Sequence, residues 1–301
     1  MSYPGGKAGP GVFHRIISLM PPHEIYIEPF MGGFSIGRLK RPAKLNIGID
    51  VDRAAVQMAF LFCQARWRAE YPVDEKDASE ARSPHAETQE PRPQEAPEAA
   101  SADPLSRTFE ASGSRWQFFE YDGIVYLETM ARCNWHFGKQ PDGTLIYCDP
   151  PYMRHTCASR CRYKHDMTDP EHRRLLRALQ DLNALPEPPM LMISGYDSDL
   201  YRQTLMPISG TGQPWTHITF QTMTRGGTKA TEHLWFNFAP PTVLHDYRYV
   251  GTNFRDRERI KRAQTTWVRK LKRLKPYERE ALLAAIAETA SAGDASRNVL
   301  S

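Results

Sequence analysis

The sequence predicts an α/β fold: a mainly parallel sheet with an antiparallel terminal hairpin, followed by a basic helical C-terminal segment. Short apolar runs typical of buried strands occur at 25–28, 45–49, 116–119, 145–148 and 190–193. Apolar residues at helical spacing occur at 13–19, 54–68 and 170–182. This alternation favours parallel strands. The last two strands, 216–222 and 233–238, have no helix between them and should pair antiparallel.

Composition sets the limits on this fold. The chain has 301 residues, enough for one large domain or two modest ones, and its hydrophobic fraction of 41% allows a core. No apolar stretch approaches the length that spans a bilayer, and the first residues lack the layout of a secretion signal. Five cysteines without a disulfide-framework spacing fit a reducing compartment, so we expect a cytoplasmic protein. The net charge of +4 is a weak indication of a nucleic-acid partner.

An acidic, low-complexity insertion is predicted over 73–107. Between 73 and 104 large apolar side chains are almost absent. The acids there are Asp74, Glu75, Asp77, Glu80, Glu87, Glu90, Glu95, Glu98 and Asp103, against Lys76, Arg82 and Arg92. Such a segment cannot bury enough surface to offset its ordering entropy, so we predict a disordered linker, with partner binding as the alternative. It divides one catalytic domain into a cofactor-binding part, 1–72, and a catalytic part, 108–244.

A basic helical extension is predicted over 245–301. Between 245 and 275 many Lys and Arg residues stand against Asp246, Asp256 and Glu258, with apolar residues at roughly helical spacing among them. A second helix is expected over 277–290. The positive face, which includes Arg269, Lys270, Lys272 and Arg273, would attract a phosphate backbone without reading sequence. The alternative is a solvated helix whose apolar stripe packs on the main domain, and both can hold together.

The tetrapeptide Asp149-Pro150-Pro151-Tyr152 follows the buried run at 145–148. Two prolines cannot continue a sheet or enter a helix interior, so the chain must leave the strand in an extended, rigid form. This presents a carboxylate, carbonyl groups and an aromatic ring at a strand's carboxyl end, where ligands bind in open α/β sheets. Together they suit a flat group that bears an NH2. The alternative is a plain turn in which Asp149 caps and Tyr152 packs.

A second ligand-binding loop follows the first strand, at Glu28-Pro29-Phe30-Met31-Gly32-Gly33. Its glycines allow the backbone to approach a ligand closely. The spacing departs from the dinucleotide fingerprint, and no basic P-loop residue follows, so neither a dinucleotide nor a triphosphate is expected. Asp50, after the second strand, is well placed to hold ribose hydroxyls. A nucleoside without phosphates fits best.

In this order and spacing, the motifs resemble the D12 class of adenine-specific DNA N6-methyltransferases, which includes the Dam enzymes. The family opens with an aromatic residue and then Gly-Gly-Lys, as Tyr3-Pro4-Gly5-Gly6-Lys7 does here. Its acid-Pro-Phe-x-Gly run matches Glu28 to Gly32, and its catalytic motif matches Asp149 to Tyr152. The resemblance implies a Rossmann-like methyltransferase sheet and S-adenosyl-L-methionine as the cofactor.

The resemblance also implies roles for individual residues. Those implied to be catalytic are Asp149, Pro150, Pro151 and Tyr152. Those implied to contact the cofactor are Tyr3, Lys7, Glu28, Pro29, Phe30, Gly32, Gly33, Asp50, Asp122 and Asp149. Asp122 would face the adenine ring, although a turn at Asp122-Gly123 explains it equally well. Asp149 and the Pro150 carbonyl would accept hydrogen bonds from the NH2 of a flipped-out base on which Tyr152 stacks, and no metal is required.

Two further groups of cations are predicted to contact DNA. They are Arg154, Arg160, Arg162 and Lys164 after the tetrapeptide, and Arg225 and Lys229 between the last two strands. The alternative for the first group is a structural zinc on His155, Cys157, Cys161 and His165, whose spacings do not match a standard finger. The alternative for the second group is a plain β-turn.

The leading functional prediction is methylation of adenine N6 in DNA. One alternative is methylation of RNA adenine or of cytosine N4, since the tetrapeptide serves any exocyclic amine. Another is a nucleic-acid-binding protein with an inactive methyltransferase fold. A bacterial or phage enzyme of this kind acts alone or beside a cognate restriction endonuclease, in the bacterial cell or the infected host. The family's target-recognition region falls where this chain has its acidic insertion, which leaves the target sequence open.

Overall fold

The computed structural model describes residues 7, 11–70, 105–133, 143–153, 165–206, 213–223 and 229–297. The chain divides into two compact units, Met1–Tyr247 and Arg248–Ser301. The division falls three residues after the predicted start of the basic extension at 245. Most of the predicted acidic insertion, residues 73–104, lies outside the described residues. Within the described parts, no helix combines the length and apolar character needed to cross a bilayer.

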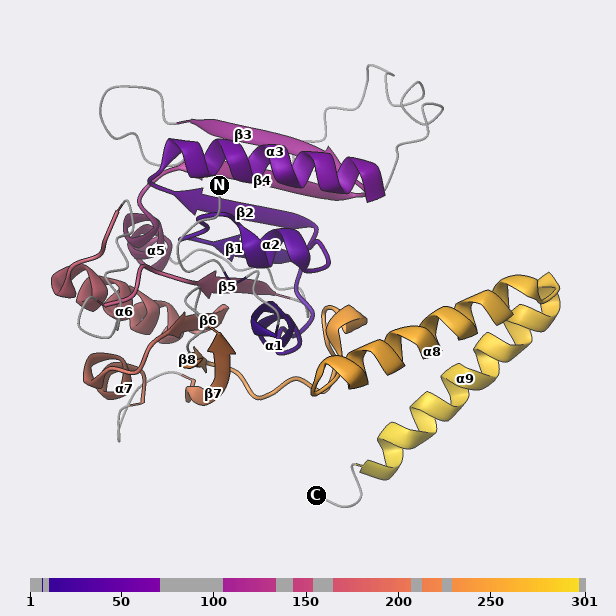
Figure 1. The fold of residues 1–301 in the computed structure, drawn as a ribbon. Helices are drawn as coiled ribbons and strands as arrows, with labels where there is room; N and C mark the ends of the chain where they lie inside the picture. The colour runs from indigo at the N-terminus through magenta and orange to yellow at the C-terminus, as the bar shows by residue number, and fades with distance from the viewer. Residues whose placement is uncertain are drawn as a thin grey trace. The chain divides into compact units, whose positions relative to one another are not determined.

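The first unit is built on one eight-stranded sheet with the order β3-β4-β2-β1-β5-β6-β8-β7 (Figure 1). The strands are β1 Ile25–Glu28, β2 Leu45–Asp50, β3 Ser106–Ala111, β4 Ser114–Glu120, β5 Thr144–Cys148, β6 Met190–Gly195, β7 Thr216–Met223 and β8 Lys229–Phe236. Strands β4, β2, β1, β5 and β6 are parallel, and β7 and β8 form an antiparallel pair beside β6. The predicted α/β class, with its antiparallel terminal hairpin, is confirmed.

Some boundaries differ from the prediction. Strand β3 was not expected, and it begins at Ser106, so the predicted insertion ends too late at 107. Its apolar residues are sparse because it is an edge strand, paired antiparallel with β4 alone. The turn between them uses left-handed backbone at Ser112 and Gly113, with φ of 53° and 72°. The final strand runs from Lys229 to Phe236 instead of 233–238, because its exposed first half is polar.

The helices of the first unit are α1 Val12–Ile17, α2 Ser35–Leu39, α3 Arg53–Glu70, α5 Gly123–Arg132, α6 Asp169–Asn183 and α7 Asp199–Leu205. The helices predicted over 13–19, 54–68 and 170–182 correspond to α1, α3 and α6. A capping box begins α6, with the Thr168 N–H donating to Glu171 Oε2 at 2.7 Å. Helices α5 and α7 were not predicted.

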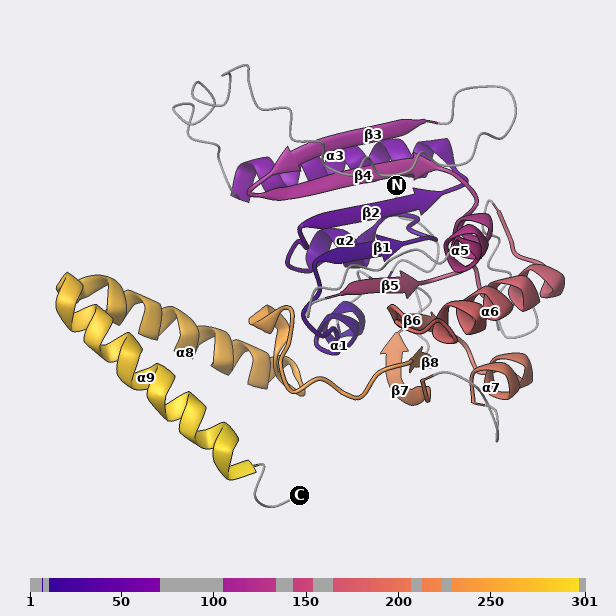
Figure 2. The same ribbon diagram turned by 180° about the vertical axis from the view of Figure 1, so that it is seen from behind.

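The two faces of the sheet are covered by different helices (Figures 1 and 2). Ile27 and Ile49 point toward one face, where side chains of α5, α6 and α7 complete the core. Trp116 and Phe118 of β4 pack on the other face against Phe34 and the α3 residue Trp67. Because residues alternate sides along a strand, both faces are apolar, as expected for buried parallel strands.

The order of the strands determines where the sheet can bind a ligand. From β1 the chain adds β2 and β4 toward one edge, then returns to place β5 and β6 on the other side of β1. The carboxyl ends of β1 and β5 therefore flank the point where the strand order reverses. In open α/β sheets the crevice at this point is the usual ligand site.

The second unit contains α8 Phe254–Arg273 and α9 Pro276–Arg297, and the two predicted C-terminal helices are thereby confirmed. Asn253 caps α8, its side chain accepting the Asp256 N–H at 3.0 Å. No residue of α8 is buried, and Trp267 is 56% exposed. The apolar residues Trp267 and Val268 of α8 are therefore left exposed.

Candidate active site

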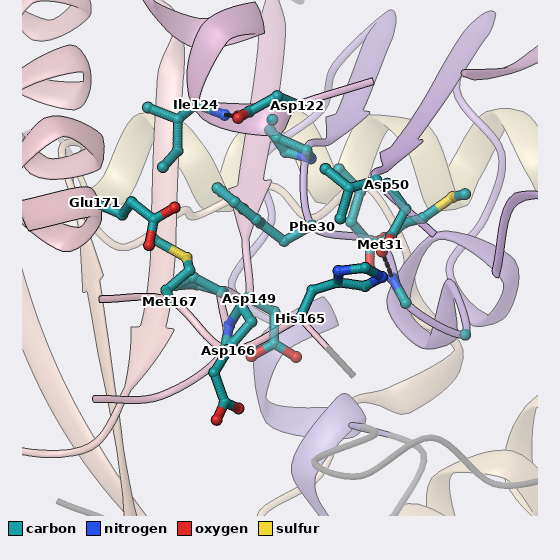
Figure 3. A pocket seen from close by; sticks show the side chains of 18 of the residues that line it. Phe30, Met31, Asp50, Asp122, Ile124, Asp149, His165, Asp166, Met167 and Glu171 are labelled. Atoms are coloured by element: carbon teal, nitrogen blue, oxygen red, sulfur yellow. Dashed lines mark hydrogen bonds between the residues drawn. The ribbon is translucent and has the colours of Figure 1, made fainter. Parts of the chain in front are cut away.

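A pocket lies at the carboxyl ends of β1, β2, β4 and β5, at the reversal of strand order (Figure 3). Its lining includes Lys7, Glu28, Pro29, Phe30, Gly32, Gly33, Asp50, Asp122, Asp149, Pro150 and Pro151. These are all of the predicted catalytic and cofactor residues except Tyr152, which lies beside it, and Tyr3, which is outside the described residues. The structure therefore brings residues from distant parts of the sequence around one cavity.

The loop after β1 is held in shape by Asp50. Gly32 has a left-handed φ of 45° and donates its N–H to Asp50 Oδ2 at 2.8 Å. The other carboxylate oxygen of Asp50 accepts the Asp52 N–H at 2.8 Å. Phe34, also left-handed at φ 51°, then starts α2. Asp50 thus fixes the loop, and it also lines the cavity where ribose hydroxyls were predicted.

Glu28 is a buried carboxyl group at the base of the pocket. It is 2% exposed, and its Oε2 accepts the Tyr26 hydroxyl at 2.8 Å and the Gly37 N–H at 3.0 Å. Burial raises the pKa of Glu28 to about 8, although these two hydrogen bonds oppose the shift. The group is therefore mainly neutral at pH 7 in this structure.

Asp122 has two roles that the sequence left as alternatives. Its Oδ1 accepts the N–H groups of Ile124 and Val125 at 2.7 and 3.2 Å, which caps α5. The same residue lines the pocket, as Figure 3 shows. The small residue after it is also required, since a Cβ on Gly123 would lie 2.2 Å from the Pro29 carbonyl oxygen. Helix α5 and the β1 loop are therefore packed directly against each other.

Asp149 is held by two side chains from other segments. Lys7 Nζ lies 2.8 Å from Asp149 Oδ1, and the Ser194 hydroxyl donates to the same oxygen at 3.0 Å. Ser194 closes β6 and is also hydrogen-bonded to the Tyr147 hydroxyl at 2.9 Å. Among the described residues, the second oxygen, Oδ2, has no hydrogen-bond partner. The carboxylate is thus fixed through one oxygen and leaves the other for a ligand.

Tyr152 packs into the protein and does not present an open ring. It is 8% exposed, and its hydroxyl donates to Glu232 Oε1 at 2.5 Å. Lys7 Nζ lies 4.6 Å from the centre of its ring, and the ring of Tyr196 meets it at 4.5 Å and 62°. Burial raises the pKa of Tyr152 well above its usual value, so its hydroxyl is neutral. In this conformation Tyr152 supports its neighbours, and stacking on a base would require Lys7 or Tyr196 to move.

Glu232 is a site residue that sequence reasoning missed. It lies on β8 at 4% exposure, with Oε1 3.0 Å from Lys7 Nζ. Glu232 lies two residues before the apolar end of β8, and an acid at a buried position of a strand is the available signal. Burial raises the pKa of Glu232, an effect that the charge of Lys7 opposes. Burial also acts to lower the pKa of Lys7, but Asp149 and Glu232 outweigh it and raise the value, so Lys7 is charged.

Another part of the pocket lining was not predicted. His165, Asp166, Met167 and Glu171 form it, just before and within the start of α6 (Figure 3). His165 belongs to the zinc alternative, whose other members His155, Cys157 and Cys161 lie outside the described residues. Within the part of the chain that the structure describes, no three His, Cys, Asp or Glu side chains are grouped to hold a metal ion.

The predicted DNA contacts are only partly described. Arg154, Arg160, Arg162, Lys164 and Arg225 lie outside the described residues, and Lys229 is exposed at the start of β8. On α8, Arg269, Lys272 and Arg273 lie with Gln264 and Thr265 on one face of the helix. Lys270 instead lies over the Trp267 ring, 4.6 Å from its centre.

Comparison with known proteins gives remote structural likeness alone. No family model and no curated protein matches the chain. An rRNA methylase from Streptococcus thermophilus aligns at 10% identity and a TM-score of 0.38, covering 75% of this chain and 95% of its own. A candidate methyltransferase from Streptococcus mutans, in complex with SAH, aligns at 11% identity and a TM-score of 0.36, and the alignment covers 75% of this chain and 95% of that protein. At these values the activity of this chain has to be inferred from its own site.

Proposed function

We propose that this chain is an S-adenosyl-L-methionine-dependent methyltransferase that methylates the exocyclic N6 amine of adenine in DNA. The observation that carries the proposal is the position of Asp149-Pro150-Pro151. It lies at the end of β5, at the reversal of strand order, and shares one pocket with the β1 loop and Asp50. The resemblance of these same motifs to adenine-specific DNA methyltransferases supports the substrate.

The described lining residues fit S-adenosyl-L-methionine better than a phosphorylated cofactor. Carboxyl groups reach the pocket from four strand ends, through Glu28, Asp50, Asp122 and Asp149. Lys7 is paired with Asp149 and Glu232, so it is not offered to a phosphate. Hydrogen-bond acceptors of this kind suit a ligand that carries an ammonium and two ribose hydroxyls. Bound there, the cofactor supplies a methyl group already activated on positive sulfur.

The protein's contribution would be to orient the acceptor amine. The adenine amine is a poor nucleophile because its lone pair is delocalised into the ring. Asp149 Oδ2, which has no partner among the described residues, and the Pro150 carbonyl are acceptors for its two N–H groups. These hydrogen bonds would favour a pyramidal nitrogen with its lone pair directed at the methyl carbon. The new N–C bond would form as the bond between the methyl carbon and sulfur breaks, and one N–H proton would then leave, with Asp149 as the acceptor placed to receive it.

The nucleic-acid partner is supported by the positive charge of α8. Arg269, Lys272 and Arg273 lie on one cationic face of the helix that can contact phosphates, although it does not read bases. Because the target amine is hidden in a duplex, the base must be flipped out before transfer.

The proposal is tested by transfer of radiolabelled methyl groups to duplex DNA, single-stranded DNA and RNA, offered separately. Label is expected in DNA with the wild-type protein, and it should be lost in Asp149→Ala while DNA binding persists. Asp181→Ala, an exposed acid on α6, is the matched control and should transfer normally. Label in RNA alone would show that the substrate is RNA and not DNA. Full activity of Asp149→Ala would contradict the catalytic role of Asp149.

A further inference from the structure

A group of four polar side chains consists of the candidate catalytic carboxylate and three buried residues that lie against it. It consists of Lys7, Asp149, Tyr152 and Glu232, from four positions in the sequence. Lys7 is bonded to all three partners: its ammonium contacts both carboxylates and donates to the Tyr152 hydroxyl. Three of these residues belong to the predicted site, and Glu232 of β8 joins them from the opposite side of β6.

A carboxylate as buried as Glu232 is costly unless it is paired and hydrogen-bonded. The two groups that compensate it are the Lys7 ammonium at 3.0 Å and the Tyr152 hydroxyl at 2.5 Å. A purely structural acid would find partners anywhere in the core. Both partners of Glu232 instead hold the reacting region, one by bonding Asp149 and the other by ending the tetrapeptide.

Glu232 on β8 is connected to Asp149 through Lys7 and Tyr152. Glu232 holds one side of the ammonium, so that Lys7 can approach Asp149 Oδ1 at 2.8 Å from the other. Glu232 also fixes the hydroxyl of Tyr152, whose ring lies beneath the same ammonium. Ser194 holds Oδ1 as well, at 3.0 Å. Together they hold Oδ1, which leaves Oδ2 as the oxygen available to the proposed acceptor amine.

We infer that Glu232 is a positioning residue for methyl transfer, which it serves by orienting Lys7 and Tyr152 around Asp149. The inference rests on the proposed function and extends it to a strand that carries none of the motifs behind the resemblance. Glu232 touches neither the acceptor nor the methyl donor. Its loss should therefore reduce turnover while leaving the binding of the cofactor product nearly unchanged.

The test compares Glu232→Gln with Glu232→Ala and with Thr231→Ala, an exposed neighbour on the same strand. Glutamine keeps an oxygen that can accept from Tyr152 but removes the charge that holds Lys7. Glu232→Gln is expected to lower kcat by about 10-fold or more, and Glu232→Ala further. The dissociation constant for S-adenosylhomocysteine should stay within about twofold of wild type in Glu232→Gln, and Thr231→Ala should behave as wild type.

A second readout does not depend on activity. The rate at which an amine-reactive reagent such as acetic anhydride labels Lys7 can be followed by mass spectrometry. Lys7 is 5% exposed and paired with two acids, so it should be protected in the wild type. It should react faster in Glu232→Gln, with exposed lysines such as Lys44 as internal standards.

The outcomes separate the inference from the proposed function. Unchanged kcat in Glu232→Gln, or kcat and product affinity that fall together with thermal stability, would overturn the positioning role. If the wild-type protein transfers no methyl group to DNA or RNA, the proposed function fails. The labelling result then decides alone whether Glu232 orients Lys7, and equal rates in wild type and Glu232→Gln would contradict it.

Discussion

Single carboxyl groups in this protein differ in what surrounds them. Asp149 is bonded by an ammonium and a hydroxyl, and Asp50 accepts two backbone N–H groups. Glu28 is fully enclosed and accepts one hydroxyl and one N–H. The same functional group therefore serves as a hydrogen-bond acceptor, a loop anchor and a neutral acid, depending on its neighbours.

Glu28 gives a prediction about stability and pH. Its pKa is raised in the folded chain to about 8 from an ordinary value of 4.5. Between these values the unfolded chain loses the proton first, so the free energy of unfolding should fall as pH rises through this window and level off above it. The contribution is at most on the order of 5 kcal/mol. Urea unfolding of wild type and Glu28→Gln at pH 5 to 9 should show a weaker pH dependence in the variant; parallel curves would contradict the buried acid.

Some residues of the candidate site could be predicted from the sequence, and others could not. Lys7, Asp50 and Asp149 were recognisable because each stands in a local motif. Glu232 acts through contacts across the sheet, and no local pattern reveals which strand lies beside which. The buried position of the Tyr152 ring likewise depends on Lys7 and Tyr196, which reach it from distant segments.

At the scale of elements, buried strands were the most predictable. Their apolar runs are continuous, and β1, β2, β5 and β6 fall within a residue or two of the predicted ranges. The edge strand β3 was missed because one side of it meets water, leaving Phe109 and Ala111 as its buried residues. Helix α7 was missed because it is short, with Tyr201 and Leu205 as its buried residues.

The packing of α5 on the β1 loop gives a second prediction. In Gly123→Ala the added methyl would overlap the Pro29 carbonyl oxygen, and both atoms are attached to backbone that cannot easily move. We expect a loss of about 1–3 kcal/mol of stability and weaker S-adenosylhomocysteine binding, because the loop lines the pocket. Calorimetric titration and thermal unfolding measure both. Gly143→Ala is the matched control, since a Cβ there has open space; equal behaviour of the two variants would contradict the packing.

Helix α8 gives a third prediction. Neutralising Arg269, Lys270, Lys272 and Arg273 should weaken binding to duplex DNA and make it less sensitive to salt. The slope of log affinity against log salt should become shallower by about 0.9 for each phosphate that the variant no longer neutralises. The control neutralises four exposed cations of the first unit, Lys44, Arg107, Arg173 and Arg177, with the same change in net charge. An unchanged slope in the α8 variant would show that these cations face solvent and do not contact DNA phosphates.

At the scale of the whole molecule, the chain combines a sheet that carries the candidate site with a separate basic unit. The strand order places the pocket, and that order arises from pairings between segments more than a hundred residues apart, such as β1 with β5. The sequence predicted the class of sheet and the residues at its strand ends. It did not predict the position of β8, which brings Glu232 to the site.

The most direct measurement is identification of the product nucleoside. Duplex DNA would be incubated with the protein and S-adenosyl-L-methionine carrying a deuterated methyl group, then digested and analysed by mass spectrometry. We predict deuterated N6-methyldeoxyadenosine with wild type and none with Asp149→Ala. Label on cytosine N4 would support transfer to an exocyclic amine but show that the target base is cytosine and not adenine. Absence of any labelled nucleoside, with the cofactor bound, would contradict the central claim.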